Sequence, residues 1–148
     1  MSEDRIERDT LIEASLERVW SLVSTPGFWV AEEAAVAGKV ATAGDSFVAK
    51  NPNLGEVAVR VEKVDPPKYV AYRWASAFPG EDLRDDNSTL VEITLATEAG
   101  NTRLSVVETG FATLAGAEEL RENALQFNTE GWPLVFDMLR QHVEQSVA

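Results

Sequence analysis

The chain of 148 residues has the length of one domain, since domains usually run about 100–200 residues, and its 45% hydrophobic and 26% charged residues are typical of a globular protein. Thirteen basic and 25 acidic residues give a formal charge of −12, which argues against a surface for nucleic acids or anionic membranes. With no cysteine and a single histidine, His142, the sequence offers neither a disulfide framework nor a multi-histidine metal centre, so we expect no metal and no cofactor.

The N-terminal half begins with a strand and a helix. A strand is predicted at residues 6–12, and alternation places four side chains on one face: Ile6, Arg8, Thr10 and Ile12. Ser15 can cap a following helix, whose apolar stripe has helical spacing: Leu16, Val19, Trp20 and Val23. Thr25-Pro26-Gly27 ends this helix, and the aromatic segment 28–30 is either a turn or a second short helix.

Between residues 38 and 111 the hydrophobic period changes to two, which predicts antiparallel strands joined by turns. The predicted strands are residues 36–40, 45–50, 57–61, 70–74, 91–95 and 104–108. The acidic loop 78–88, with Glu81, Asp82, Asp85 and Asp86, is expected to be solvated.

The remaining residues predict one long helix from Ala115 to about Ser146. We expect its inner stripe to contain Leu120, Ala124, Phe127, Gly131, Val135, Met138 and His142. Pro133 lacks an N–H group and would clash with the carbonyl of Thr129, so a kink or restart is expected near Gly131. The order of elements predicts an α+β fold with six to seven antiparallel strands around the C-terminal helix and two short helices after the first strand.

Several ordered motifs resemble a known family. They are IEASLERVW at residues 12–20, GDSF at 44–47, VDPPKYVAYRW at 64–74, TRL at 102–104, Gly110-Phe111 and Gly131-Trp132. This set, which covers nearly the whole chain, is similar to the START-like (SRPBCC) superfamily. Within it, the chain resembles the branch named after the C-terminal domain of the activator of the ninety-kilodalton heat-shock protein's ATPase. The resemblance implies a single helix-grip domain over residues 1–148 and a cavity between sheet and helix.

Aromatic side chains are candidates to line such a cavity, or simply to fill the core. They are Phe47, Tyr72, Trp74, Phe111, Phe127, Trp132 and Phe136, of which we expect Trp74 and Trp132 to be buried. All but Phe111 are taken as candidate ligand-binding residues, together with Glu108 and Arg8.

Glu108 is the most informative polar residue, because it shares the alternation of Leu104 and Val106 and should point inward. A buried carboxylate is costly unless it is paired or hydrogen-bonded. The resemblance implies that the strand of Arg8 lies beside that of Glu108. Three roles remain open for Glu108: a structural ion pair with Arg8, escape to solvent at the strand end, or a carboxylate that orients a ligand.

The leading functional hypothesis is the binding of a small hydrophobic or amphipathic molecule between the sheet and the C-terminal helix. The alternatives are a co-chaperone-like module that binds a protein partner, and a cyclase- or hydrolase-type enzyme that uses polar residues of the cavity. No nucleophile elbow, phosphate-binding loop or metal-ligand spacing occurs in the sequence, so no catalytic residue is assigned and an enzyme is not the expected outcome. With no apolar run of about 18 residues and no signal-peptide pattern, we expect a cytoplasmic protein that does not enter a membrane.

Overall fold

The computed structural model of the protein describes residues 5–24, 43–51, 55–78 and 80–145. Within them, six antiparallel strands form one sheet in the order β1-β6-β5-β4-β3-β2. The strands are β1 (Arg5–Ile12), β2 (Ser46–Asn51), β3 (Gly55–Asp65), β4 (Tyr69–Trp74), β5 (Thr89–Glu98) and β6 (Asn101–Thr109). The helices described are α1 (Leu16–Val23) and α2 (Glu118–Gln145), with 3₁₀ turns at Asp85–Asn87 and Phe111–Thr113. The α+β class is confirmed.

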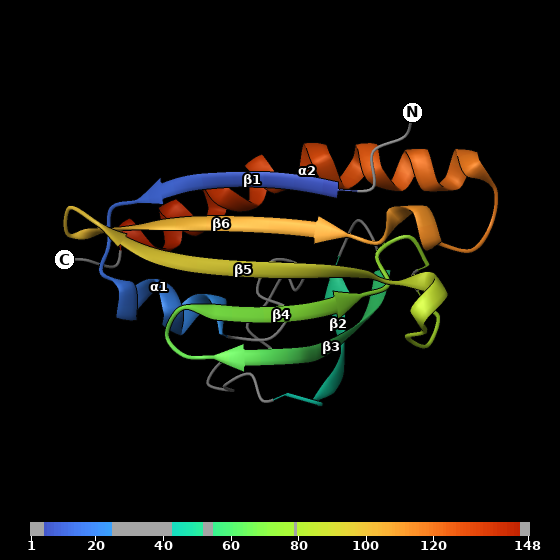
Figure 1. Cartoon of the computed structure of the whole chain (residues 1–148), viewed down its shortest axis with the longest axis horizontal. Coiled ribbons are helices and arrows are strands. Elements are labelled where there is room, and N and C mark those ends of the chain that lie inside the picture. Colours follow the sequence, from blue (N-terminus) through green and yellow to red (C-terminus); the bar gives the residue numbers. More distant parts are fainter. Residues whose placement is uncertain (1–4, 25–42, 52–54, 79, 146–148) are drawn as a thin grey trace.

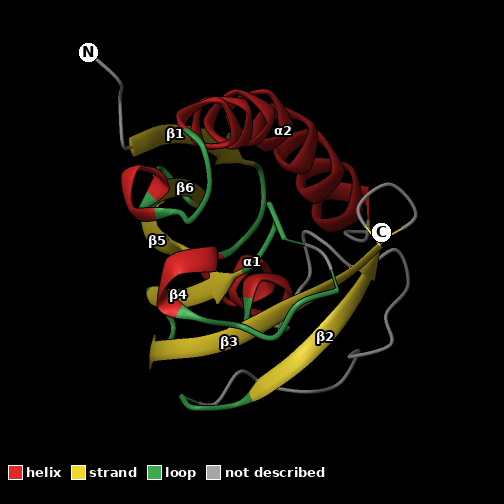
Figure 2. Cartoon of the chain, turned by 90° about the vertical axis from the view of Figure 1, so that its right-hand side faces the viewer, coloured by secondary structure: helices red, strands yellow, loops and turns green. Residues whose placement is uncertain are grey.

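The sheet is curved, and α1 and α2 both lie on its concave side (Figures 1 and 2). Figure 2 shows α2 running along the β1–β6 side of the curve, while α1 lies inside it. A curved antiparallel sheet that holds a C-terminal helix is consistent with the helix-grip arrangement. None of the described helices is long and apolar enough to cross a membrane.

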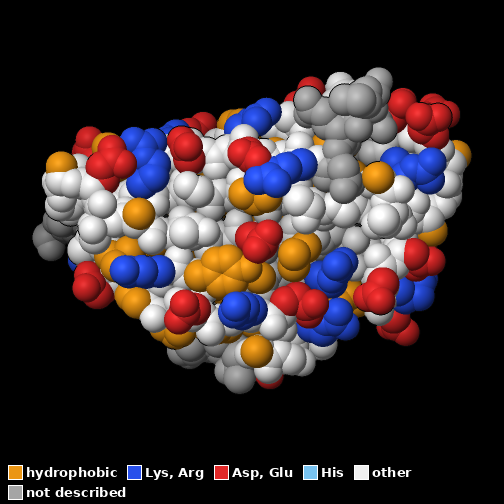
Figure 3. Space-filling view, in the orientation of Figure 1, with side chains coloured by type: hydrophobic (Ala, Val, Ile, Leu, Met, Phe, Trp, Pro, Cys, Tyr) orange, Lys and Arg blue, Asp and Glu red, His pale blue; other side chains and the backbone are white. Residues whose placement is uncertain are grey.

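Alternation along the strands separates a buried concave face from an outer charged face. The concave face carries the core residues Val57, Val59, Val61, Val70, Tyr72, Val91, Ile93, Leu95, Leu104 and Val106. The outer face carries both signs of charge, interspersed over the sheet (Figure 3). Ion pairs link several of these groups, including Arg60 with Glu62 at 2.6 Å and Arg103 with Glu98 at 3.0 Å. The concave side is therefore where an apolar site can form.

Helix α1 is fixed at both ends. The Ser15 hydroxyl accepts a hydrogen bond from the backbone N–H of Arg18 at 3.3 Å, as an N-cap should. Val19 and Val23 are buried against the sheet. At the other end the Tyr72 hydroxyl donates to the carbonyl of Val23 at 2.5 Å, and burial raises the pKa of this hydroxyl well above its usual value.

Helix α2 buries a different stripe from the one expected. Its buried residues are Asn128, Trp132, Phe136, Leu139 and Val143. Phe127 and Met138, which we placed on the inner stripe, are 55% and 41% exposed. The apolar residues of α2 extend around much of the helix, so hydrophobic spacing alone does not specify which neighbouring row faces the sheet.

The start of α2 also differs from the expectation. Gly116 has a φ of 101°, a left-handed backbone that helical residues do not adopt, so the helix begins at Glu118 rather than near Ala115. The helix then continues through Pro133 without a restart at Gly131. The expected turn or helix at residues 28–30 and the expected strand at 36–40 lie outside the described residues.

Candidate functional site

The candidate site is organised around Glu108, near the end of β6. Its side chain is fully buried, and its backbone lies opposite Ile6 of β1 on one side and Val91 of β5 on the other. The inward orientation expected from alternation is confirmed. Immediately afterwards Gly110 adopts a φ of 103°, which turns the chain out of the sheet and into the connection to α2.

Four side chains donate hydrogen bonds to this carboxylate. Oε2 accepts from Trp74 Nε1 at 2.8 Å, Thr89 Oγ1 at 2.6 Å and Asn128 Nδ2 at 2.9 Å. Oε1 accepts from Trp132 Nε1 at 2.8 Å. The donors belong to β4, β5 and α2, so one carboxylate joins three strands of the sheet to the long helix.

All four donors are electrically neutral, which determines the electrostatics of the site. Burial raises the pKa of Glu108 above its usual value, and the four hydrogen bonds lower it in part. Each indole N–H can only donate, so both carboxylate oxygens must act as acceptors. A protonated Glu108 would need an acceptor for its O–H group. Among the four donors, the Thr89 hydroxyl is the one that becomes such an acceptor by a simple rotation.

The two tryptophans also form an aromatic wall beside the carboxylate. Trp74 and Trp132 are 6% and 3% exposed, which confirms their predicted burial. Their ring centroids lie 6.5 Å apart with a 54° angle between the planes, and Trp132 lies 6.4 Å from Phe136. These distances are within the range in which tilted aromatic pairs attract each other.

Of the three roles left open for Glu108, the structural ion pair with Arg8 is not found among the described residues. Arg8 is exposed, and its guanidinium donates to the carbonyl of its neighbour Glu7 at 2.7 Å. The reason is that β1 is an edge strand, so a long side chain there can leave the concave face for water. Escape of Glu108 to solvent is excluded by its burial.

The remaining candidate residues occupy separate places. Tyr72 lies in the core and fastens α1 to the sheet, as described above. Phe136 is buried beside Trp132, and Phe127 lies on the neighbouring exposed row of α2. The backbone of Phe47 pairs with Val59 in the β2–β3 hairpin, and its side chain lies outside what the structure describes.

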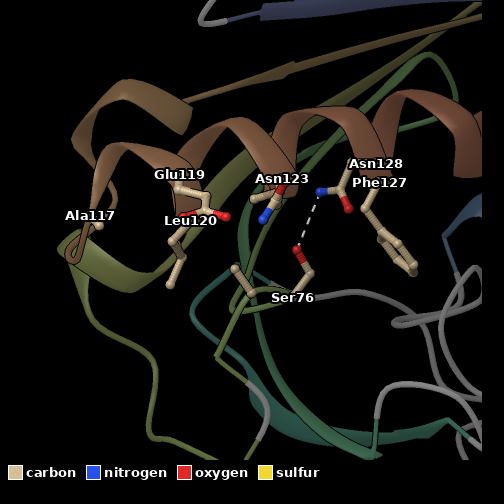
Figure 4. Close-up of a pocket in the computed structure, with 9 residues that line it drawn as sticks. Ser76, Ala117, Glu119, Leu120, Asn123, Phe127 and Asn128 are labelled. Atoms are coloured by element: carbon tan, nitrogen blue, oxygen red, sulfur yellow. Dashed lines mark hydrogen bonds between the residues drawn. The ribbon is translucent and has the colours of Figure 1, made fainter.

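A pocket of about 560 Å³ opens between the first half of α2 and the segment that follows β4. Its lining residues are Ser76, Ala77, Ala117, Glu119, Leu120, Asn123, Ala124, Phe127 and Asn128 (Figure 4). The backbone N–H of Ala75 donates to the carbonyl of Ala58 on β3 at 3.0 Å, which fixes the start of this segment. Asn128 donates to the Ser76 hydroxyl at 3.2 Å across the pocket wall.

Asn128 connects the pocket with the buried carboxylate. The same Nδ2 group that contacts Ser76 also donates to Glu108. Of the residues proposed from the sequence, the structure brings Trp74, Glu108 and Trp132 together and leaves Phe127 at the pocket.

Sequence reasoning missed Asn128, Thr89 and Ser76. Two signals for them were present: Asn128 lies four residues before Trp132 and so shares its helix face, and Thr89 continues the alternation of Val91 and Ile93. Ser76 had no such signal, because it follows the end of β4 in a turn. Groups of acidic or histidine side chains able to hold a metal ion are not found among the described residues.

The comparison with protein families is decisive for classification. The family model for "Activator of Hsp90 ATPase homolog 1-like protein" matches residues 13–144. The chain belongs to this family. The matched segment includes α1, the sheet from β2 to β6 and nearly all of α2, and therefore the whole Glu108 site. No curated protein matches the chain in sequence.

Solved structures with low sequence identity share the fold of this Activator of Hsp90 ATPase homolog 1-like chain. The protein MLL2253 from Mesorhizobium loti has a TM-score of 0.71 at 18% identity, with 97% of this chain and 99% of that chain covered. The Aha1 dimer from Colwellia psychrerythraea has a TM-score of 0.71 at 17% identity, with 99% and 100% covered. DynU16, from the dynemicin biosynthetic locus, has a TM-score of 0.70 at 20% identity, with 98% of this chain but 49% of that chain covered.

Proposed function

We propose that this chain binds a small hydrophobic or amphipathic molecule in the pocket between α2 and the segment after β4. The observation that carries the proposal is the link from pocket to carboxylate: Asn128 lines the pocket and is held by the buried Glu108. A mostly apolar cavity with a few fixed polar groups is the usual form of a small-molecule site, and 560 Å³ is within the common range of about 300–1,000 Å³.

The apolar part of the pocket comes mainly from α2. Leu120 and Ala124 are half-buried against the core, and Phe127 is more than half exposed beside them. Ala77 supplies the opposite wall. An apolar ligand seated here would cover part of the Phe127 ring and so reduce the apolar area that the protein exposes to water.

The structural neighbours do not distinguish between the candidate functions of this chain. One is named for Aha1 and another comes from the dynemicin biosynthetic locus, and both are at most 20% identical to this chain. The choice of a small-molecule site therefore depends on the geometry of the pocket.

Nile red, an uncharged dye that fluoresces in apolar surroundings, provides the test. We expect saturable binding to the purified chain. Asn123→Trp should abolish it, because Asn123 is exposed and lines the pocket, so the larger ring fills the cavity at little cost to the core. Gln126→Trp is the matched control, an exposed neutral residue of the same helix outside the pocket lining.

Two results would contradict the proposal: no saturable dye binding by the native chain, or equal binding by Asn123→Trp and Gln126→Trp. Native mass spectrometry of the purified chain adds an independent readout. A retained molecule that is lost in Asn123→Trp but kept in Gln126→Trp would support the proposal.

A co-chaperone-like role is the second candidate, and exposed apolar side chains on α2 favour it. Leu134 and Met138 are 71% and 41% exposed and lie one turn apart, a geometry suited to contact with another protein. Stimulation of a chaperone ATPase that is lost in Leu134→Asp, with dye binding unchanged, would support this role. An ATPase unaffected by the native chain would remove it.

A further inference from the structure

The pocket lining contains a hydrogen-bond acceptor for which the described part of the chain supplies no donor. Asn128 is 4% exposed, and its Nδ2 group donates to Glu108 Oε2 at 2.9 Å and to Ser76 Oγ at 3.2 Å. With the nitrogen committed to these partners, the amide oxygen is left on the other side of the group. Within the described residues, this Oδ1 atom has no hydrogen-bond donor.

The buried carboxylate is the reason for this orientation. Glu108 is surrounded by donors and offers acceptor oxygens, so Asn128 must turn its NH₂ group toward it. Rotating the amide would place two oxygens against each other in a desolvated site. Glu108 thus acts through Asn128 as a positioning residue, which leaves the Asn128 Oδ1 atom as an acceptor in the pocket lining.

The charges around the pocket also favour a ligand group that donates hydrogen bonds, and in particular one that is positively charged. The described lining residues include the carboxylate of Glu119 and no lysine, arginine or histidine. Arg121, the nearest cation in this part of the α2 sequence, donates to the carbonyls of Leu114 and Gly116 at 3.3 and 2.8 Å. The N-terminus of a helix favours anions, but the first-turn residues Glu118 and Glu119 already offset its partial positive charge.

We infer that the ligand of this pocket is an amphipathic molecule whose polar end is a protonated primary amine. The ammonium group donates to Asn128 Oδ1, and the apolar part lies along Phe127, Ala124 and Leu120 toward the start of α2, where Glu119 adds a longer-range attraction for a cation. This inference rests on the proposed function and specifies its ligand class. A carboxylate in the same place would face Asn128 Oδ1 and Glu119 with no cation among the described lining residues.

The test compares three straight-chain probes of ten carbons each: decylamine, decan-1-ol and decanoate. Each displaces Nile red from the native chain at pH 7, below the concentration at which it forms micelles. We expect decylamine to bind about tenfold more tightly than decan-1-ol, because a charge-assisted hydrogen bond is stronger than a neutral one. Decanoate should bind more weakly than the alcohol.

Two variants separate the pocket charge from the charge of the whole chain. Glu119→Gln should weaken decylamine binding about threefold and leave decan-1-ol unchanged, since an exposed charge contributes modestly. Glu122→Gln removes the same charge from an exposed α2 residue outside the pocket lining and should change neither.

Equal affinities for the three probes, a preference for decanoate, or an equal effect of Glu119→Gln and Glu122→Gln would overturn the inference. In each case Nile red binding that is lost in Asn123→Trp would still support the proposed pocket. If, by contrast, the native chain does not bind Nile red, or if Asn123→Trp binds it equally well, the proposed pocket itself is wrong. The two failures are therefore distinguishable.

Discussion

Trp132 of α2 and Glu108 of β6 face each other with the indole Nε1 atom 2.8 Å from the carboxylate Oε1 atom. Because an indole N–H can only donate, Trp132 requires an acceptor at this point. The other oxygen, Oε2, already accepts from three donors. Both oxygens must therefore accept, and an amide in place of the carboxylate cannot meet this requirement.

Glu108→Gln should lower the free energy of unfolding by about 1–3 kcal/mol, the usual cost of leaving a buried polar group unsatisfied. The Gln oxygen can occupy the three-donor position, but its NH₂ group then faces the Trp132 N–H. Urea denaturation at pH 7 measures the loss. The control is Glu92→Gln, a half-buried acid on β5 that accepts from the Tyr69 hydroxyl, where we expect a change under about 0.5 kcal/mol.

Trp132→Phe tests the cause of that loss, because it removes the indole N–H that the Gln amide opposes. In the double variant with Glu108→Gln, the Gln NH₂ group no longer faces an indole N–H. The double variant should therefore lose less unfolding free energy than the two single variants added together, with a coupling of about 0.5–3 kcal/mol. Strict additivity of the two changes would show that the Trp132 hydrogen bond is not what Glu108 provides.

Part of this site was predictable from the sequence. Alternation with Leu104 and Val106 predicts that Glu108 points inward, and alternation with Val70 and Tyr72 does the same for Trp74. The burial of Trp132 is also confirmed, although the inner stripe expected for α2 does not include it. The donor set did not follow, because Glu108 and its four donors are separated by 19 to 34 positions along the chain. Only the register between strands and the face of α2 bring them together.

Two errors have a common physical origin. Alternation correctly grouped Arg8 with the inner face of its strand, but it does not say that the strand is an edge from which a long side chain reaches water. Likewise, helical spacing placed Phe127 on the inner row, although Asn128, the next residue, is the one that is buried. Position within a sheet and helix rotation are tertiary properties, and local periodicity constrains them weakly.

The stability of the native chain should depend on pH through Glu108. Burial raises its pKa in the folded state, so the folded chain holds this proton more tightly than the unfolded chain. The contribution is therefore fully present below the unfolded pKa of about 4.3, and it is lost as pH rises through the higher folded pKa. Unfolding free energies of the native chain and Glu108→Gln, measured from pH 4 to 8, should differ by an amount that declines with pH. A difference that is constant or grows with pH would contradict this sign.

Arg8→Ala should leave stability nearly unchanged, because Arg8 is exposed and, among the described residues, its guanidinium hydrogen-bonds to the neighbouring backbone carbonyl of Glu7. We expect a change within about 0.5 kcal/mol, as for most surface positions. Its coupling with Glu108→Gln in a double-mutant cycle should be zero within error. A coupling above about 1 kcal/mol would show that Arg8 and Glu108 interact, contrary to the four neutral donors that surround Glu108 in the structure.

Tyr72→Phe should weaken the attachment of α1 to the sheet and so lower the stability of the chain. The lost hydroxyl leaves the carbonyl of Val23 without its donor at a buried helix end, at a cost of about 1 kcal/mol. Tyr69→Phe is the comparison, because the half-buried Glu92 that loses this donor can turn to water instead. Thermal unfolding should show the larger loss for Tyr72→Phe, and equal losses would mean that the Val23 contact adds nothing specific.

Pro133→Ala should stabilise the chain. Pro133 lies in the interior of α2, where it removes one backbone hydrogen bond to the carbonyl of Thr129, and its side chain is exposed, so little packing is lost on replacement. Since proline costs about 3 kcal/mol relative to alanine inside a helix, we expect a gain of about 1–3 kcal/mol in the free energy of unfolding. Leu134→Ala, at the next and 71% exposed position, should change it by less than about 0.5 kcal/mol. If Pro133→Ala instead lowers stability and shifts the fluorescence of Trp132, the proline is what holds the indole against Glu108, and its cost to the helix is offset by that contact.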